Sequence, residues 1–216
     1  MQVEFIDGIF YVIVLIMSVV IHEFAHGYTA YRLGDNTARD MGRLTLNPIK
    51  HLDPFGSVIL PLLLIISNAG FVIGWAKPVP YNPNNLRDFR KGTFLVSVSG
   101  IIANLLMALL FGLLIRLAPS LGLPLYIDSI QTLHPFYKIS TIIVFTNLVL
   151  AIFNLIPIPP LDGSKILFSA LPPKYRYIEN FLEQYGFLLL IIFIVFIWGR
   201  LSLIIYLLFS LITGLN

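Results

Sequence analysis

Five consecutive residues, His22-Glu23-Phe24-Ala25-His26, carry the side chains in this sequence that are best suited to chemistry. On a helix, positions i and i+4 share one face, with Cβ atoms roughly 5–6 Å apart. The two histidines can therefore converge on one metal ion, and the adjoining glutamate can reach a water molecule beside it. This spacing is typical of zinc-dependent hydrolysis. We predict that His22 and His26 are metal ligands and that Glu23 is a general base.

The motif lies in the second half of an apolar run from about Ile9 to Tyr31, whose first half is polar only at Ser18. An ionisable side chain near the centre of a bilayer costs on the order of 2–3 kcal/mol. Three of them within five residues therefore favour a functional site. In the alternative interpretation, the helix ends near Ile21 and the motif lies among lipid headgroups without a metal.

The composition indicates a protein embedded in a lipid bilayer. Of 216 residues, 57% are hydrophobic and only 12% are charged, and the mean hydropathy is +0.88. Soluble domains carry roughly 25% charged residues, so a soluble enzyme is excluded. The absence of cysteine excludes a disulfide scaffold and a thiolate metal site. The net charge of +3 is too small for a nucleic-acid surface.

A spanning helix needs about 20 mostly apolar residues, and the sequence contains five runs of about that length or more. We expect an all-α polytopic membrane protein with a small re-entrant or β element after the first helix. A single membrane-embedded domain covers residues 1–216, with a core of about 9–170 and C-terminal membrane helices at about 185–213. The last run, Phe187 to Ile212, is long for one span and short for two, which predicts one long helix or a span plus an interfacial piece. The runs after the first are Phe55 to Trp75, Phe94 to Ala118, Ile139 to Ile158 and Phe187 to Ile212.

Lysine and arginine near the spans predict the orientation. The stretches 32–50, 77–91 and 160–183 are richer in basic residues than the connection 116–138, so we place them on the cytoplasmic side. The run Phe55 to Trp75, interrupted by proline and glycine, then enters and leaves by the same face as a re-entrant segment or hairpin. A plain additional span is the alternative.

Catalytic zinc takes three protein ligands and keeps one position open. Asp162 is our candidate for the third, because Pro157, Pro159 and Pro160 break the preceding helix and allow the chain to turn back. The alternatives are Asp53 and His51, although a histidine in a loop more often bonds to the backbone. His134 falls in the loop on the opposite side and is too distant.

Two amides inside the apolar runs are further candidates. Asn104 is best explained by a hydrogen bond between helices. Asn154 comes shortly before Asp162, so its amide could donate to the oxyanion of a tetrahedral intermediate.

Together these segments resemble the site-2 protease family of intramembrane zinc metallopeptidases. The resemblance rests on the motif at 22–26, on Asn154 to Gly163, which is similar to the family's N-x-x-P…D-G motif, and on Gly100 to Asn104, which is similar to its G-x-x-x-N pattern. It covers about residues 9–170. The segments 42–48 and 74–80 resemble the small branch of the family that lacks a PDZ domain.

The resemblance implies one zinc ion per chain held by His22, His26 and Asp162, with Glu23 as base and Asn154 assisting at the scissile carbonyl. It also implies a transmembrane-helix protein as substrate and a site within the bilayer near the cytoplasmic side, in the plasma membrane of a prokaryote. Relatives often have a β element after the first core helix, which Gly42 to Leu46 could supply. The oligomeric state stays open.

Other function classes fit the sequence less well. A membrane metal-binding or metal-transport protein without peptidase activity would need several ligand pairs on different helices, and this chain has four histidines. A di-iron membrane oxidase would need more histidines still. An inactive relative is disfavoured because His22, Glu23, His26 and Asp162 are all present.

Overall fold

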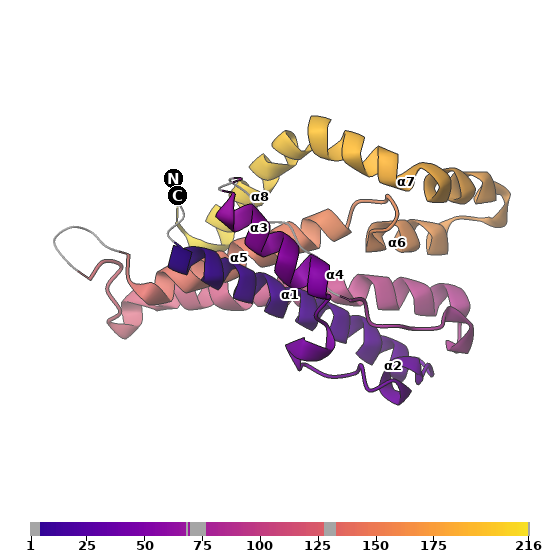
Figure 1. Cartoon of the computed structure of the whole chain (residues 1–216), viewed down its shortest axis with the longest axis horizontal. Coiled ribbons are helices and arrows are strands. Elements are labelled where there is room, and N and C mark those ends of the chain that lie inside the picture. Colours follow the sequence, from indigo (N-terminus) through magenta and orange to yellow (C-terminus); the bar gives the residue numbers. More distant parts are fainter. Residues whose placement is uncertain (1–4, 68, 70–76, 128–132, 216) are drawn as a thin grey trace.

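The computed structural model describes residues 5–67, 69, 77–127 and 133–215. Its long helices are α1 (Phe5–Arg32), α4 (Phe89–Leu117), α5 (Pro135–Asn154) and α7 (Arg176–Phe196) (Figure 1). Each is long and apolar enough to cross a bilayer, and the described residues contain no strand. The expected all-α polytopic membrane fold is confirmed. The shorter α-helices are α2 (Thr37–Asp40), α3 (Leu60–Ile66), α6 (Asp162–Ala170) and α8 (Trp198–Thr213), and the remaining helical turns are Pro48–Lys50, Pro54–Ile59, Pro83–Asn85, Pro119–Leu121 and Pro173–Tyr175.

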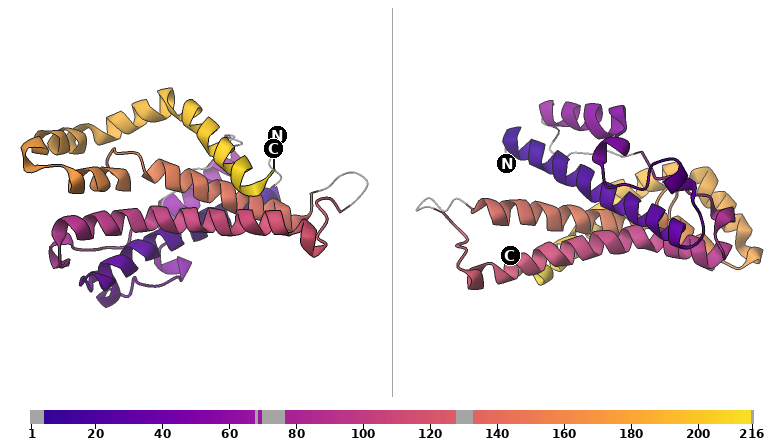
Figure 2. Two further views of the ribbon diagram at one scale, coloured as in Figure 1. Left: turned by 180° about the vertical axis from the view of Figure 1, so that it is seen from behind. Right: turned by 90° about the horizontal axis from the view of Figure 1, so that it is seen from below.

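Helices α1, α4 and α5 lie side by side and form the centre of the molecule (Figures 1 and 2). Ala108 and Ile115 of α4, Val144 and Leu148 of α5, and Ile205 of α8 are buried together in one apolar cluster. Polar contacts fix the register of α1 as well, since the Asn147 side-chain amide of α5 donates to Ser18 Oγ of α1 at 2.9 Å. This packing sets how the second half of α1 faces α4.

Two helix boundaries differ from the predicted ones. The run expected to extend to Ile158 ends as a helix at Asn154, because the following prolines cannot continue the backbone hydrogen bonds. The C-terminal run is two helices, with α7 beginning at Arg176 and a break at Ile197 before α8. One long helix is therefore wrong, and the interfacial position of the second piece stays a prediction.

The segment Phe55 to Trp75 begins with helical residues 54–66, while residues 68 and 70–76 lie outside the described residues. In the described part of the segment, the thirteen helical residues 54–66 are too few to cross a bilayer. The backbone amide of Lys77 donates to the carbonyl of His51 at 2.8 Å, so the segment starts and ends at the same place. A single crossing would separate those ends by about 30 Å, and the geometry therefore favours a re-entrant segment or hairpin.

The β element suggested for Gly42 to Leu46 is wrong, because this stretch forms no strand. The Arg43 amide bonds back to the carbonyl of Ala38 at 2.8 Å. The neighbouring segment contains Pro78 and Pro80, which lack the N–H groups that a strand ladder needs. The Arg43 guanidinium connects the two segments instead, donating to the carbonyls of Lys77 (2.9 Å) and Pro78 (3.3 Å).

Candidate metal centre

Helices α1 and α6 bring three side-chain atoms to one point. Nε2 of His22 and Nε2 of His26 lie 3.0 Å apart, and Oδ2 of Asp162 lies 3.0 Å from the first and 2.9 Å from the second. All three residues are buried. Ligands about 2.0–2.1 Å from a tetrahedral zinc ion lie roughly 3.3 Å from one another. The three predicted ligands are thus brought together at distances that fit zinc, and Asp162 arrives from 136 residues beyond His26.

Hydrogen bonds on the other ring nitrogens prepare both histidines for a metal. Nδ1 of His22 lies 2.9 Å from Asn104 Oδ1, and Nδ1 of His26 lies 2.6 Å from the Val96 carbonyl. Both partners are oxygen acceptors, so with a metal ion on Nε2 each Nδ1 would carry the proton and donate it. Nε2 of both rings is the atom aimed at the common point. Partners of this kind orient metal-bound histidines in proteins generally.

Gly100 of α4 provides the space for the two imidazole rings. A Cβ atom at this position would lie 2.6 Å from Nε2 of His26 and 2.7 Å from Cε1 of His22. Such distances are far inside van der Waals contact, so the rings could not keep their positions. The absence of a side chain at Gly100 is therefore part of the site.

We expect Gly100→Ala to weaken zinc binding by roughly tenfold or more, the range found when groups that orient metal ligands are lost. Zinc affinity measured by chelator competition checks this. The matched control is Gly199→Ala in α8, where a Cβ would have no atom within 4 Å and affinity should not change. Equal zinc affinity in Gly100→Ala and the wild type would contradict this role.

Glu23 follows His22 on α1, and its carboxylate is fixed by the segment that crosses over this helix. The backbone amide of Val79 donates to Glu23 Oε2 at 2.7 Å. The Val79 side chain also closes against Gly27, where a Cβ would lie 2.7 Å from Val79 Cγ1. One carboxylate oxygen of Glu23 is therefore engaged by residues 77–82, which we call the crossing segment.

Asp35, three residues after α1 ends at Arg32, holds the far end of the crossing segment. Its carboxylate accepts the Asn82 amide at 2.7 Å, the Asn85 side-chain amide at 2.8 Å and the Thr37 hydroxyl at 2.6 Å. Burial alone would raise the pKa of Asp35, but these hydrogen bonds hold that pKa below its ordinary value. A permanently ionised carboxylate therefore holds this loop in place at neutral pH.

The other candidates from the sequence lie elsewhere. His51 is buried with Nε2 bonded to the Thr45 carbonyl at 2.8 Å, and Asp53 caps a helical turn by accepting the Gly56 amide at 2.7 Å. Nδ1 of His134 accepts the Phe136 amide at the start of α5. The Asn154 amide donates to the Leu150 carbonyl of its own helix at 3.0 Å. No contact between Asn154 and the three clustered side chains is found among the described residues, and its oxyanion role stays a prediction.

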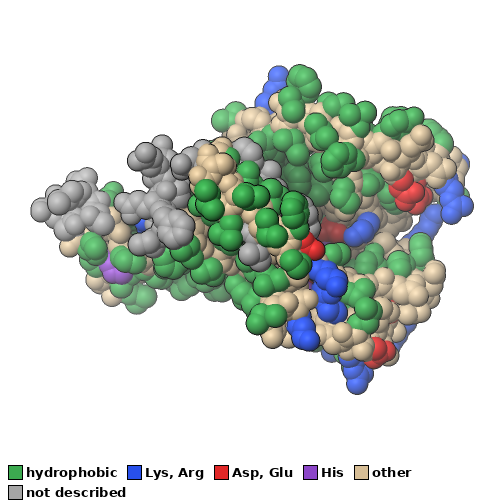
Figure 3. Space-filling model, in the orientation of Figure 1, with side chains coloured by type: hydrophobic (Ala, Val, Ile, Leu, Met, Phe, Trp, Pro, Cys, Tyr) green, Lys and Arg blue, Asp and Glu red, His purple; other side chains and the backbone are tan. Residues whose placement is uncertain are grey.

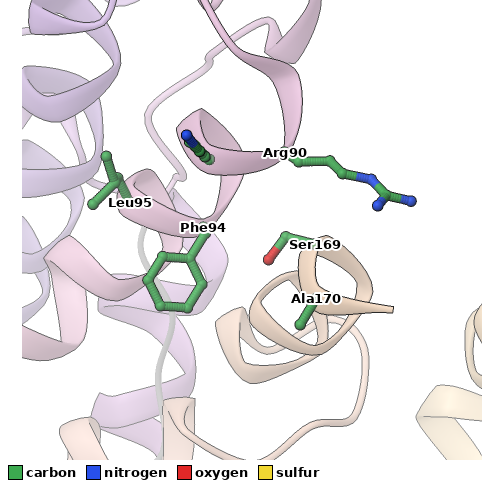
Figure 4. Close-up of a pocket in the computed structure, with 6 residues that line it drawn as sticks. Arg90, Phe94, Leu95, Ser169 and Ala170 are labelled. Atoms are coloured by element: carbon green, nitrogen blue, oxygen red, sulfur yellow. The ribbon is translucent and has the colours of Figure 1, made fainter. Parts of the chain in front are cut away.

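A pocket of about 320 Å³ lies between the first turns of α4 and the end of α6 (Figure 4). It is lined by Arg90, Lys91, Phe94, Leu95, Ser169 and Ala170. None of the three clustered metal-binding side chains lines it, so this pocket and the candidate metal centre are separate.

Comparisons with known proteins agree with this geometry. The sequence profile of peptidase family M50 matches residues 118–194, a range that includes Asn154 and Asp162. A protein of Bacillus subtilis (strain 168) named "Putative zinc metalloprotease YwhC" is 42% identical over 85% of this chain and 79% of its own length. The chain belongs to peptidase family M50, the site-2 protease family.

A second similar protein is more distant. It is "Putative zinc metalloprotease Rip2" of Mycolicibacterium smegmatis, 31% identical over 87% of this chain and 68% of its own length. No solved structure matches the chain. M50 membership confirms the resemblance inferred from the motifs, and with the four apolar helices it identifies a multi-pass membrane metallopeptidase.

Proposed function

We propose that this chain is an intramembrane zinc endopeptidase that hydrolyses peptide bonds within or near the transmembrane segments of membrane-protein substrates. The observation that carries the proposal is the convergence of His22 Nε2, His26 Nε2 and Asp162 Oδ2 within 2.9–3.0 Å of one another. M50 membership and the names of the relatives support zinc as the metal.

The ligand set suits a catalytic ion. Two neutral imidazoles and one carboxylate supply three ligands, which leaves a fourth position for reactants. When bound, zinc polarises the peptide carbonyl and makes water a stronger nucleophile at neutral pH. His22, His26 and Asp162 would hold the ion, and Asn104 and the Val96 carbonyl orient the two histidines.

Glu23 moves the protons of the reaction. Its Oε2 is engaged by the Val79 amide, which leaves Oε1 to take a proton from the attacking water. The same carboxyl group then delivers that proton to the nitrogen of the leaving amine. Asn154 would assist by donating to the oxygen of the scissile carbonyl, which requires its amide to release the Leu150 carbonyl.

The depth of the site supports cleavage inside the bilayer. His22 lies ten residues before the end of α1 at Arg32, which is about 15 Å along the helix axis. His22 therefore lies within the part of α1 that a 30 Å hydrocarbon core can cover, nearer to the Arg32 end than to the Phe5 end. A substrate helix must unwind at such a site, because an intact helix keeps its carbonyls in hydrogen bonds.

The basic residues support placing the end where α1 stops and α4 begins on the cytoplasmic side. The bacterial relatives support the plasma membrane of a prokaryote as the location. Figure 3 shows basic side chains gathered at this end of the molecule and a hollow there with acidic and basic groups inside. We propose that water enters from this side.

The proposal is tested with purified protein in liposomes and single-span substrates that differ in helix-breaking residues. We expect zinc-dependent cleavage at positions inside or beside the apolar segment, and faster cleavage when glycine or proline is present there. Mass spectrometry of the products locates the cut. Protein that holds zinc yet cleaves no membrane substrate would contradict the proposal and favour a metal-binding or transport function.

A further inference from the structure

The two carboxylate oxygens of Asp162 have different partners. Oδ2 faces the nitrogens of His22 and His26, while Oδ1 accepts a hydrogen bond from Nζ of Lys165 at 3.1 Å. Asp162 is buried, with 7% of its side chain exposed, whereas 41% of the Lys165 side chain is exposed. The lysine therefore stands between a buried carboxylate and the surface.

The local sequence explains why Lys165 reaches Asp162. Both residues lie in the first turn of α6, three positions apart, a spacing at which helical side chains are neighbours. Gly163 keeps the turn tight, since a Cβ there would lie 2.4 Å from the carbonyl oxygens of Leu155 and Ile156. The backbone thus fixes Asp162 and Lys165 as a unit against the end of α5.

Lys165 also contacts the crossing segment. Its Nζ lies 5.9 Å from the centre of the Tyr81 ring, a distance at which a cation is attracted to the ring face. Tyr81 is two residues from Val79, whose amide engages Glu23. One cation therefore touches both the third ligand and the segment that holds the base.

We propose that Lys165 is a positioning residue of the metal centre, which occupies Oδ1 of Asp162 so that Oδ2 alone faces the metal. This inference rests on the proposed zinc site. Without the lysine, the carboxylate could rotate or present both oxygens, and the crossing segment would lose the contact between Tyr81 and Lys165. The ammonium group also offsets the negative charge of Asp162 in a buried site, where unpaired charges are costly.

The test compares Lys165→Met, Lys165→Arg and the wild type, with Lys174→Met as the control for loss of a positive charge. Lys174 lies over the Tyr175 ring and follows α6 in the chain. We expect Lys165→Met to bind zinc about 10–100-fold more weakly in chelator competition. Lys165→Arg should recover most of the affinity because it keeps a charged donor, and Lys174→Met should match the wild type.

Two further readouts separate positioning from a general structural effect. In cobalt-substituted protein, the visible absorption reports ligand geometry, so it should change in Lys165→Met and return in Lys165→Arg. At saturating zinc, Lys165→Met should lower kcat more than it raises KM. Unchanged zinc affinity and cobalt spectrum in Lys165→Met would overturn the inference, whether or not the wild type cleaves. If Lys165→Met binds zinc more weakly but the wild type cleaves no substrate, the positioning role of Lys165 is supported. Only the proposed peptidase activity is then rejected.

Discussion

Replacing Glu23 by glutamine is expected to abolish cleavage while leaving zinc in place. The amide has the shape of the carboxylate but cannot take a proton from water, and loss of a general base costs typically 10²- to 10⁴-fold in rate. Its oxygen can still accept the Val79 amide, which now bonds to Glu23 Oε2 at 2.7 Å, so the crossing segment should stay in position. The measurement is the cleavage rate of a single-span substrate, with zinc per chain determined on the same sample.

The control for Glu23→Gln is Glu179→Gln, which removes an acidic side chain from the first turn of α7. It should cleave at the wild-type rate. Cleavage at the wild-type rate by Glu23→Gln would show that another group moves the proton. Loss of zinc together with activity would mean that Glu23 helps to hold the ion.

Replacing Asp162 by asparagine should weaken zinc binding by tenfold or more, since even losses outside the ligand shell have effects of this size. A neutral amide is a poorer ligand for a dication, and Lys165 would lose its ionic partner. Activity should fall at limiting zinc and return in part when zinc is raised. Chelator competition and zinc-dependent rates measure both effects.

Asp53→Asn is the matched control because Asp53 was the alternative third ligand. Its carboxylate caps a helical turn at the Gly56 amide, and asparagine can accept the same hydrogen bond. Zinc affinity should therefore be unchanged. If Asp53→Asn lost zinc and Asp162→Asn retained it, the ligand assignment would be wrong.

The groups that converge on the metal could be predicted because local rules place them. The i, i+4 spacing puts His22 and His26 on one helix face, and the prolines after Asn154 end the helix and return the chain to α1. The first, third and fourth apolar runs correctly predicted α1, α4 and α5. A local rule applies here too, because the thickness of the bilayer sets the length and composition of a spanning helix.

The supporting groups around the ligands could not be predicted with the same detail. Asn104 was expected to bond between helices, but its partner, His22, is 82 residues away, and only the register of α4 against α1 selects it. Gly100 entered the sequence analysis only as part of the G-x-x-x-N pattern, and its closeness to both imidazoles depends on the same register. No sequence pattern assigned a role to Lys165, and the likeness of residues 74–80 to the small branch of the family did not reveal the contact between Val79 and Glu23. Long-range packing decides these contacts, and a single sequence does not encode it in any local pattern.

The break between α7 and α8 illustrates a different difficulty. The apolar run was too long for one span and too short for two, and Trp198-Gly199-Arg200 interrupts it. Composition allows a helix to continue through such a triplet, so the break at Ile197 had to come from the structure. The suggested β element failed because prolines in the neighbouring segment remove its hydrogen-bond donors.

The most direct test of the central claim is zinc-edge X-ray absorption on the purified protein with one metal ion per chain. The account predicts two imidazole nitrogens and one carboxylate oxygen from the protein at about 2.0–2.2 Å, with the oxygen contribution altered in Asp162→Asn. A spectrum without imidazole scattering, or one identical in the wild type and Asp162→Asn, would contradict it.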